Sequence, residues 1–219
     1  MTFSNELLDD GQHIWEAQKN HPFVRELASG DLDESAFQYW IEQDYRYLLD
    51  YARLFALAGA KARDEGTMTD LLAIAHSTLS HEMDLHREFA REYGISRGDL
   101  ESVRKSPTCE AYTSFLIRTA YEGSIAEISA ALYPCGQGFL DIGEHAAELA
   151  TGDHRYTPWI ETYTGGEFRE VVGMMREFVD RCGKRYPGEH EAMVEAFLTS
   201  ARLEYRFWEM AYTREEWGI

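Results

Sequence analysis

Apolar side chains recur every three or four residues along most of this chain. Between residues 33 and 55 the pattern is especially regular, with apolar or aromatic side chains at Phe37, Trp40, Ile41, Tyr47, Leu48, Tyr51, Leu54 and Phe55. This spacing predicts a long amphipathic helix with a wide buried face, and Asp33 is placed to cap its first turn. Pro is scarce, with five residues, and no long segment alternates apolar and polar side chains as a strand would. The chain is therefore predicted to be all-α.

Glycine and proline mark the expected helix ends. Pro22 fits the first turn of a short helix that stops at Gly30, Gly66 separates two helices, and Pro107 opens another that stops at Gly123. The polar segment 94–107 is expected to be a loop. The predicted helices cover about 4–19, 22–30, 33 to beyond 55, 67 or 69 to 94, 107–123, from 124 onward, 167–186 and 189–213. Since no repeat or linker divides the chain, we expect one bundle-like domain over 1–219.

Charge excludes one broad class of partner. Acidic residues number 39 against 21 basic ones, which gives a formal net charge of -18. A surface this acidic repels DNA and RNA. No apolar run approaches the roughly 20 residues of a membrane span, and residues 1–20 lack the basic and apolar blocks of a signal peptide. We expect no nucleic-acid or membrane partner, and a cytoplasmic location.

Cysteine usage agrees with a reducing compartment. The three cysteines, Cys109, Cys135 and Cys182, are an odd number and form no Cys-x-x-Cys pair. A disulfide framework or a zinc site is therefore not expected. We predict three reduced thiols, of which Cys109 and Cys182 are structural.

The segment around Cys135 is costly for a helix. It reads Ala-Leu-Tyr-Pro-Cys-Gly-Gln-Gly-Phe from Ala131 to Phe139. A Pro inside a helix costs about 3 kcal/mol, and each Gly costs about 1 kcal/mol relative to Ala. Strain of this kind is often tolerated where it directs a group at a functional site. Cys135 is therefore either a nucleophile or a small buried residue in a bent helix, and the sequence alone favours neither.

Two carboxylates fall within apolar helical faces. Asp44 shares a face with Tyr47 and Tyr51, and a buried Asp needs a cationic partner such as Arg46 or Arg53, or a ligand with N–H donors. Glu204 lies on the same side as Trp208. If Glu204 is buried, its pKa should rise toward neutrality, as a general acid or base requires. A solvent-facing Glu204 remains the alternative.

A competing constellation consists of Glu82 and His86, with His76 and His81 on the same predicted helix. Glu and His from neighbouring helices bind metals in di-iron bundles, but these use Glu-x-x-His twice, and this chain has no second copy. A structural contact between Glu82 and His86 is the preferred interpretation. A metal-dependent oxidase that uses Glu82, His86 and His76 or Asp44 is retained as the second hypothesis, and a non-enzymatic helical scaffold as the third.

Seven motifs together resemble the TenA family, also called thiaminase II. They occur in the family's order over about 21–213: His-Pro-Phe at 21–23, Gln-Asp-Tyr-Arg-Tyr-Leu at 43–48, Glu82 to His86 followed by Arg-Glu-Phe, Ser-Pro-Thr at 106–108 with Tyr112, Pro134-Cys135, Trp159 to Tyr163, and Glu204 to Tyr212. The resemblance implies a haem-oxygenase-like fold without haem, assembled as a homotetramer. It also implies hydrolysis of 4-amino-5-aminomethyl-2-methylpyrimidine to the hydroxymethyl compound, with thiamin as a further substrate, and no metal or other cofactor.

The resemblance also assigns roles to individual residues. Cys135 would add to C6 of the pyrimidine ring, and Glu204 would protonate a ring nitrogen. Asp44 would accept a hydrogen bond from the 4-amino group. The remaining implied substrate contacts are Tyr47, Tyr112, Phe139 and Tyr163. At Phe139, however, some relatives carry a phenol, so the preferred leaving group stays open.

The acidic composition generates the first testable prediction. Only four of the 21 basic residues are Lys, a balance typical of adaptation to high salt. At molar salt the Debye length is about 3 Å, so repulsion among the acidic groups is screened. We predict that the melting temperature rises as KCl increases toward molar concentration. A melting temperature that stays flat or falls would instead indicate an acidic protein from an ordinary, low-salt organism.

Overall fold

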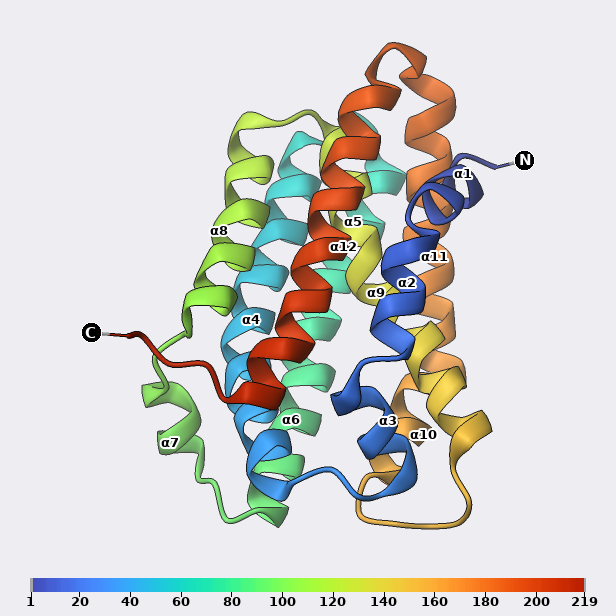
Figure 1. Ribbon diagram of the computed structural model, residues 1–219. Helices are drawn as coiled ribbons and strands as arrows, with labels where there is room; N and C mark the ends of the chain where they lie inside the picture. The colour runs from blue at the N-terminus through green and yellow to red at the C-terminus, as the bar shows by residue number, and fades with distance from the viewer. Residues whose placement is uncertain (1, 219) are drawn as a thin grey trace. The chain divides into compact units, whose positions relative to one another are not determined.

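The computed structural model describes residues 2–218, and every regular element within that range is helical (Figure 1). The all-α prediction is confirmed. The elements are α1 (Phe3–Asp10), α2 (Gln12–Lys19), α3 (Pro22–Ser29), α4 (Glu34–Lys61), α5 (Glu65–Ser77), the π-helical turn η1 (Thr78–Glu82), α6 (Met83–Glu92), α7 (Arg97–Ser102), α8 (Pro107–Glu122), α9 (Ile125–Leu149), α10 (Thr157–Thr164), α11 (Gly166–Arg185), the 3₁₀ turn η2 (Pro187–Glu189) and α12 (His190–Thr213).

Several predicted helix ends are confirmed by the capping contacts. The Asp33 side chain accepts a hydrogen bond from the backbone N–H of Ser35 at 2.8 Å and caps α4. Gly30 ends α3 with a φ of +85°, a left-handed conformation that favours glycine. Ser106 caps α8 by accepting from the N–H of Cys109 at 3.1 Å, with Pro107 in the first turn. Local side-chain chemistry therefore determines these boundaries.

Two other predictions are wrong. The single helix expected over 4–19 is broken at Gly11, where the backbone lies close to α12: a Cβ on Gly11 would lie 2.9 Å from the ring of Phe197. The loop expected over 94–107 contains α7, whose start is fixed by a capping box between Ser96 and Asp99. The short helix α10 was also not predicted, although Pro158 lies in its first turn.

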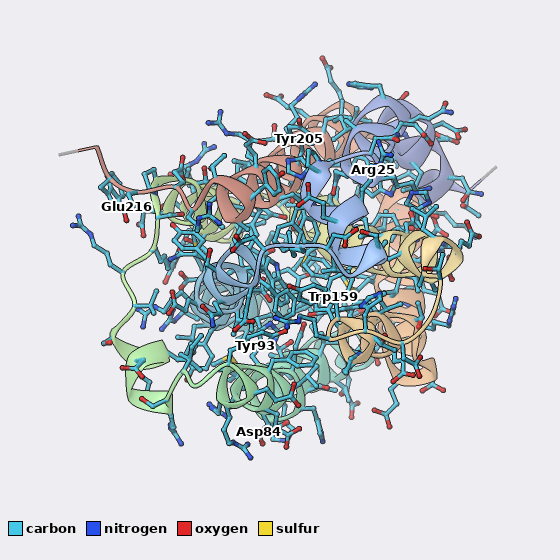
Figure 2. All side chains as sticks on the ribbon, turned by 60° about the horizontal axis from the view of Figure 1, so that its bottom comes forward. Arg25, Asp84, Tyr93, Trp159, Tyr205 and Glu216 are labelled. Atoms are coloured by element: carbon cyan, nitrogen blue, oxygen red, sulfur yellow. The ribbon has the colours of Figure 1, made fainter. Side chains whose placement is uncertain are left out.

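The helix predicted from residue 67 or 69 to 94 is interrupted by η1, in which the N–H of Met83 bonds to the carbonyl of Thr78, five residues earlier. The buried positions of this segment are Leu71, Ile74, Ala75 and Thr78, and burial then resumes at Met83 and His86. The five-residue spacing between the buried positions Thr78 and Met83 reflects the one extra residue that a π-helical turn adds to an α-helix. Beyond it, Asp84 points outward from α6, while Tyr93 packs on the ring of Phe37 (Figure 2).

The described chain forms two compact units, and each is discontinuous in sequence. Unit 1 contains Met1–Leu32 and Ala126–Glu209, and unit 2 contains Asp33–Ile125 and Met210–Ile219. That one domain covers 1–219 stays a prediction. In unit 2, α4 packs against α5, α6 and α8. In unit 1, α11 packs against α1 and α10. No helix within residues 2–218 is both long and apolar enough to cross a membrane.

The C-terminal residues 214–217, here called the C-terminal strap, bind to the start of α8 within unit 2. Both carboxylate oxygens of Glu215 accept hydrogen bonds from Thr108, one from its N–H at 2.8 Å and one from its hydroxyl at 3.1 Å. Trp217 donates to the carbonyl of Lys105, and Arg104 lies over its ring. The strap thus binds the N–H of Thr108, which the helix itself leaves without an acceptor.

Two glycines of α11 allow a matched test of helix packing in unit 1. A Cβ on Gly183 would lie 2.6 Å from Cγ of Phe3, whereas one on Gly173 would meet nothing within 4 Å. We predict that Gly183→Ala lowers the free energy of unfolding by about 1–3 kcal/mol, because α1 must shift. Gly173→Ala should raise it by up to about 1 kcal/mol through helix propensity. Urea unfolding measures both, and equal effects would contradict the close approach of α1.

Candidate active site

Helices α9 and α12 place Cys135 and Glu204 at the same level of unit 1. One turn before them, the hydroxyl of Ser200 donates to the carbonyl of Ala131 at 2.8 Å, and one turn after them, the rings of Phe139 and Trp208 lie 5.1 Å apart. The helices therefore run in the same direction, and Cys135 pairs in register with Glu204 (Figure 1). Both residues are buried, which resolves the alternative of a solvent-facing Glu204.

Aromatic rings surround the next turn of both helices. Phe139 on α9 lies 4.8 Å from Tyr163 and 6.1 Å from Trp159, both on α10, in addition to its contact with Trp208. Trp159 in turn lies 4.7 Å from Tyr163, in the interior of unit 1 (Figure 2). A thiol and a carboxyl group next to such rings suit a flat ligand with apolar faces and polar edges.

The costly segment of α9 is held by a polar network on its other side. Gln137 accepts hydrogen bonds from the Tyr133 hydroxyl at 3.0 Å and from Arg176 at 2.8 Å, and it donates to Asp141 at 2.8 Å. Trp15 donates to the other oxygen of Asp141 at 2.7 Å. The helix continues through Pro134 from Ile125 to Leu149. These side-chain bonds help to offset the cost of Pro134 and its neighbouring glycines.

The other two cysteines lie in settings that suppress thiolate formation. Burial raises the pKa of the Cys109 thiol strongly. The thiol also donates a hydrogen bond to the carbonyl of Gln43, with 3.6 Å between sulfur and oxygen. Burial also raises the pKa of Cys182. Since the thiolate is the nucleophile, neither residue is suited to that role. Both settings match the structural role predicted from the sequence.

Asp44 in unit 2 is buried and pairs with a histidine. Its Oδ2 lies 2.5 Å from Nε2 of His86, which is also buried. Of the two arginines considered as partners, Arg46 donates to the carbonyl of Glu101 and Arg53 pairs with Asp50. The suggested structural ion pair of Asp44 with an arginine is therefore wrong, because both guanidinium groups have other acceptors.

The predicted tyrosines of unit 2 pack against one another. The rings of Tyr47 on α4 and Tyr112 on α8 lie 5.0 Å apart, and the ring of Tyr51 lies 5.3 Å from that of Tyr47. Tyr47 and Tyr112 are buried. Asp44 and Tyr47, at spacing i, i+3, thus combine a carboxylate with an aromatic wall.

Glu82 and His86 do contact each other, as the preferred interpretation expected, but through the backbone. Nδ1 of His86 lies 2.9 Å from the carbonyl oxygen of Glu82. Burial raises the pKa of the Glu82 carboxyl to about 7. The charge of His86 opposes this shift, and the charge of Asp44 adds to it. Among residues 2–218, no group of three or more His, Cys, Asp or Glu side chains could hold a metal ion.

The structure brings the predicted site residues together in two groups. Unit 1 holds Cys135, Phe139, Tyr163 and Glu204, and unit 2 holds Asp44, Tyr47 and Tyr112. Trp208 was predicted to lie on the same side as Glu204, but Trp159 was not predicted as part of the first group, and His86 was not predicted as the partner of Asp44. For Trp208 the signal was its i, i+4 spacing from Glu204, but no local pattern connects Asp44 with His86.

Comparison with known proteins identifies the family. Residues 8–214 match the model of the TENA/THI-4/PQQC family. A relative from Halalkalibacterium halodurans, named aminopyrimidine aminohydrolase, is 40% identical over 221 residues, which cover 100% of this chain and 99% of that protein. The chain belongs to the TENA/THI-4/PQQC family. The resemblance to TenA proteins stated from the motifs is thereby confirmed.

Solved structures agree with this family and with its fold. A TenA homologue from P. horikoshii OT3 matches with a TM-score of 0.91 and 27% identity, over 97% of this chain and 99% of that one. A Shewanella denitrificans domain described as having a heme oxygenase-like fold matches with a TM-score of 0.79 at 14% identity, over 96% of this chain and 92% of that one. The second likeness shows the fold alone. The predicted haem-oxygenase-like fold is confirmed.

Proposed function

We propose that this protein is an aminopyrimidine aminohydrolase of thiamin salvage. It converts 4-amino-5-aminomethyl-2-methylpyrimidine to the 5-hydroxymethyl compound and releases ammonia. The observation that carries this proposal is the full-length relative of that name at 40% identity. The register of α9 and α12, which sets Cys135 level with Glu204, supports it.

The oxidase hypothesis is not supported. The full-length relative is named a hydrolase, and no cluster of potential metal ligands occurs among residues 2–218. Glu82 and His86, on which the hypothesis depended, instead contact each other through a backbone carbonyl. The same hydrolase name argues against a non-enzymatic scaffold.

In the proposed reaction, the sulfur of Cys135 forms a bond to C6 of the pyrimidine while Glu204 protonates a ring nitrogen. The ring loses its aromaticity, and its electrons expel the protonated 5-aminomethyl nitrogen as ammonia. Water then adds to the exocyclic carbon that remains. Loss of the thiolate and of the proton on the ring nitrogen restores the aromatic ring. With thiamin, the thiazole would depart in place of ammonia.

The other predicted residues would bind the substrate. Asp44, as a carboxylate, would accept a hydrogen bond from the 4-amino group, and Tyr112 and Tyr163 would bond near the thiol and the leaving group. Tyr47 and Phe139 would line the faces of the ring. An aminopyrimidine suits these residues because its faces are apolar and its edge is polar.

Substitution of the three reacting or charged residues tests the function. Purified protein in high salt, given the aminomethyl pyrimidine, should release ammonia and the hydroxymethyl product, measured by chromatography. Cys135→Ser should lower kcat by at least about 1,000-fold, because the nucleophile is lost, yet still bind the pyrimidine. Glu204→Gln and Asp44→Asn should each lower kcat/KM by about 100-fold or more.

The remaining cysteines are matched controls. Cys109→Ala and Cys182→Ala remove buried thiols of raised pKa and should leave kcat close to that of the wild-type protein. A large kinetic loss in a folded variant of either would mean that the wrong thiol was assigned. Full activity of Cys135→Ser would reject covalent catalysis by that residue.

We also propose that the protein is a homotetramer, as the family resemblance implies. Apolar side chains of unit 2 remain exposed on α5 and η1, with Met68, Leu72 and Leu79 at 39%, 46% and 47% exposure. Such neighbouring apolar groups favour burial between subunits. Light scattering should give about four times the monomer mass, and Leu72→Glu should lower it. A monomeric mass for the unaltered protein in high salt contradicts the proposal.

Two further properties are proposed. The protein is expected in the cytoplasm, where three thiols that form no disulfide would stay reduced. Adaptation to high salt is proposed from the acidic composition, and the KCl dependence of melting tests it.

A further inference from the structure

The carboxylate proposed to bind the substrate is itself held by a buried histidine. His86 has no exposed surface, and its Nε2 lies 2.5 Å from Oδ2 of Asp44. The ring of Trp40 lies 5.4 Å from the His86 ring and closes another side. Water therefore has little access to this pair, and the two side chains depend on each other for hydrogen bonding.

The second ring nitrogen determines how many protons the pair carries. Nδ1 lies 2.9 Å from the backbone carbonyl of Glu82. Since a carbonyl can only accept, Nδ1 must carry a hydrogen. One further proton then lies between Nε2 and Oδ2. The pair is therefore either an imidazolium with a carboxylate or a neutral imidazole with a carboxylic acid.

The surrounding charges favour the first of these states. Burial acts to lower the pKa of His86, but the hydrogen bond and charge of Asp44, followed by the charge of Glu82, outweigh it and raise that pKa. These two carboxyl groups come from α4 and η1, the elements that face the ring. With His86 protonated, Asp44 is a carboxylate, whose oxygens can only accept hydrogen bonds.

The π-helical turn explains why His86 lies at this position. The buried positions step by five residues from Thr78 to Met83, and His86 follows one turn later. Without the extra residue, an α-helix continuing from Thr78 would turn the following side chains by about 100°. The imidazole would then leave the face that meets Asp44. The π-helical turn, although less stable than an α-helical one, thus places His86 in contact with Asp44.

We propose that His86 is a positioning residue that fixes the orientation of Asp44 and keeps it a carboxylate, so that the site selects a 4-amino over a 4-oxo pyrimidine. The proposal rests on the proposed function of Asp44. An acceptor-only group binds the N–H of a 4-amino substituent but repels the oxygen of a 4-oxo group. A carboxylic acid at this position could instead donate to that oxygen, so loss of the imidazolium should weaken the selection.

Kinetics of His86→Gln test this selection. The variant should lose about 10- to 100-fold in kcat/KM for the 4-amino substrate, the range expected when a charged hydrogen bond is removed. Its preference for the 4-amino substrate over the 4-oxo analogue should fall by about 10-fold or more. His76→Gln and His81→Gln change exposed histidines nearby and should match the wild-type protein in both respects. An unchanged preference in a folded His86→Gln variant overturns the proposal.

A spectroscopic test needs neither catalysis nor a folded variant. Nitrogen-15 NMR of the ligand-free wild-type protein should show one histidine that keeps both ring nitrogens protonated at a pH above the usual titration range of histidine. If all histidines lose their proton together, His86 does not hold Asp44 as a carboxylate. If the wild-type protein neither binds nor hydrolyses an aminopyrimidine, the proposed function fails. The NMR signal alone then decides whether His86 and Asp44 form an imidazolium–carboxylate pair.

Discussion

The parallel register of α9 and α12 is the constraint on which the candidate active site of unit 1 depends. Ser200 and Ala131 are separated by the same number of residues in the sequence as Trp208 and Phe139, and both pairs are in contact. Glu204 and Cys135 are separated by that number as well. A slip of one residue on either helix would turn its side chain by about 100°. The packing of residues that do not react thus determines whether the thiol and the carboxyl group meet.

In unit 2, the register of two parallel helices also positions the predicted site residues. Helices α4 and α8 also run in the same direction. Gln43, in the first half of α4, accepts from the N–H of Ser106 at the start of α8, and Lys61, the last residue of α4, binds the carbonyl of Gly123 just after α8. Tyr47 and Tyr112 meet between these two contacts. In both units, buried polar groups are held by partners on a neighbouring element, which keeps their orientation fixed at the cost of strict local geometry.

The sequence predicts what short-range chemistry controls. The Asp33 cap, the helix end at Gly30 and the helix start at Pro107 were predicted from residue type alone, and the family motifs led to the fold. The break at Gly11 depends on the distant ring of Phe197, and the π-helical turn depends on the fit of His86 against Asp44. Neither has a local signature, because long-range packing determines both. The relation of Glu204 to Cys135 likewise needed the helix register.

The C-terminal strap has a consequence for synthesis on the ribosome. Glu215 caps the start of α8 by binding Thr108, which precedes it by 107 residues in the chain. Unit 1 is likewise built from segments on both sides of unit 2's first segment. Neither unit can reach its final set of contacts until its second segment has been synthesised. In nascent α8 the N–H of Cys109 can already bind Ser106, whereas the N–H of Thr108 can bind only water until residue 215 has been synthesised.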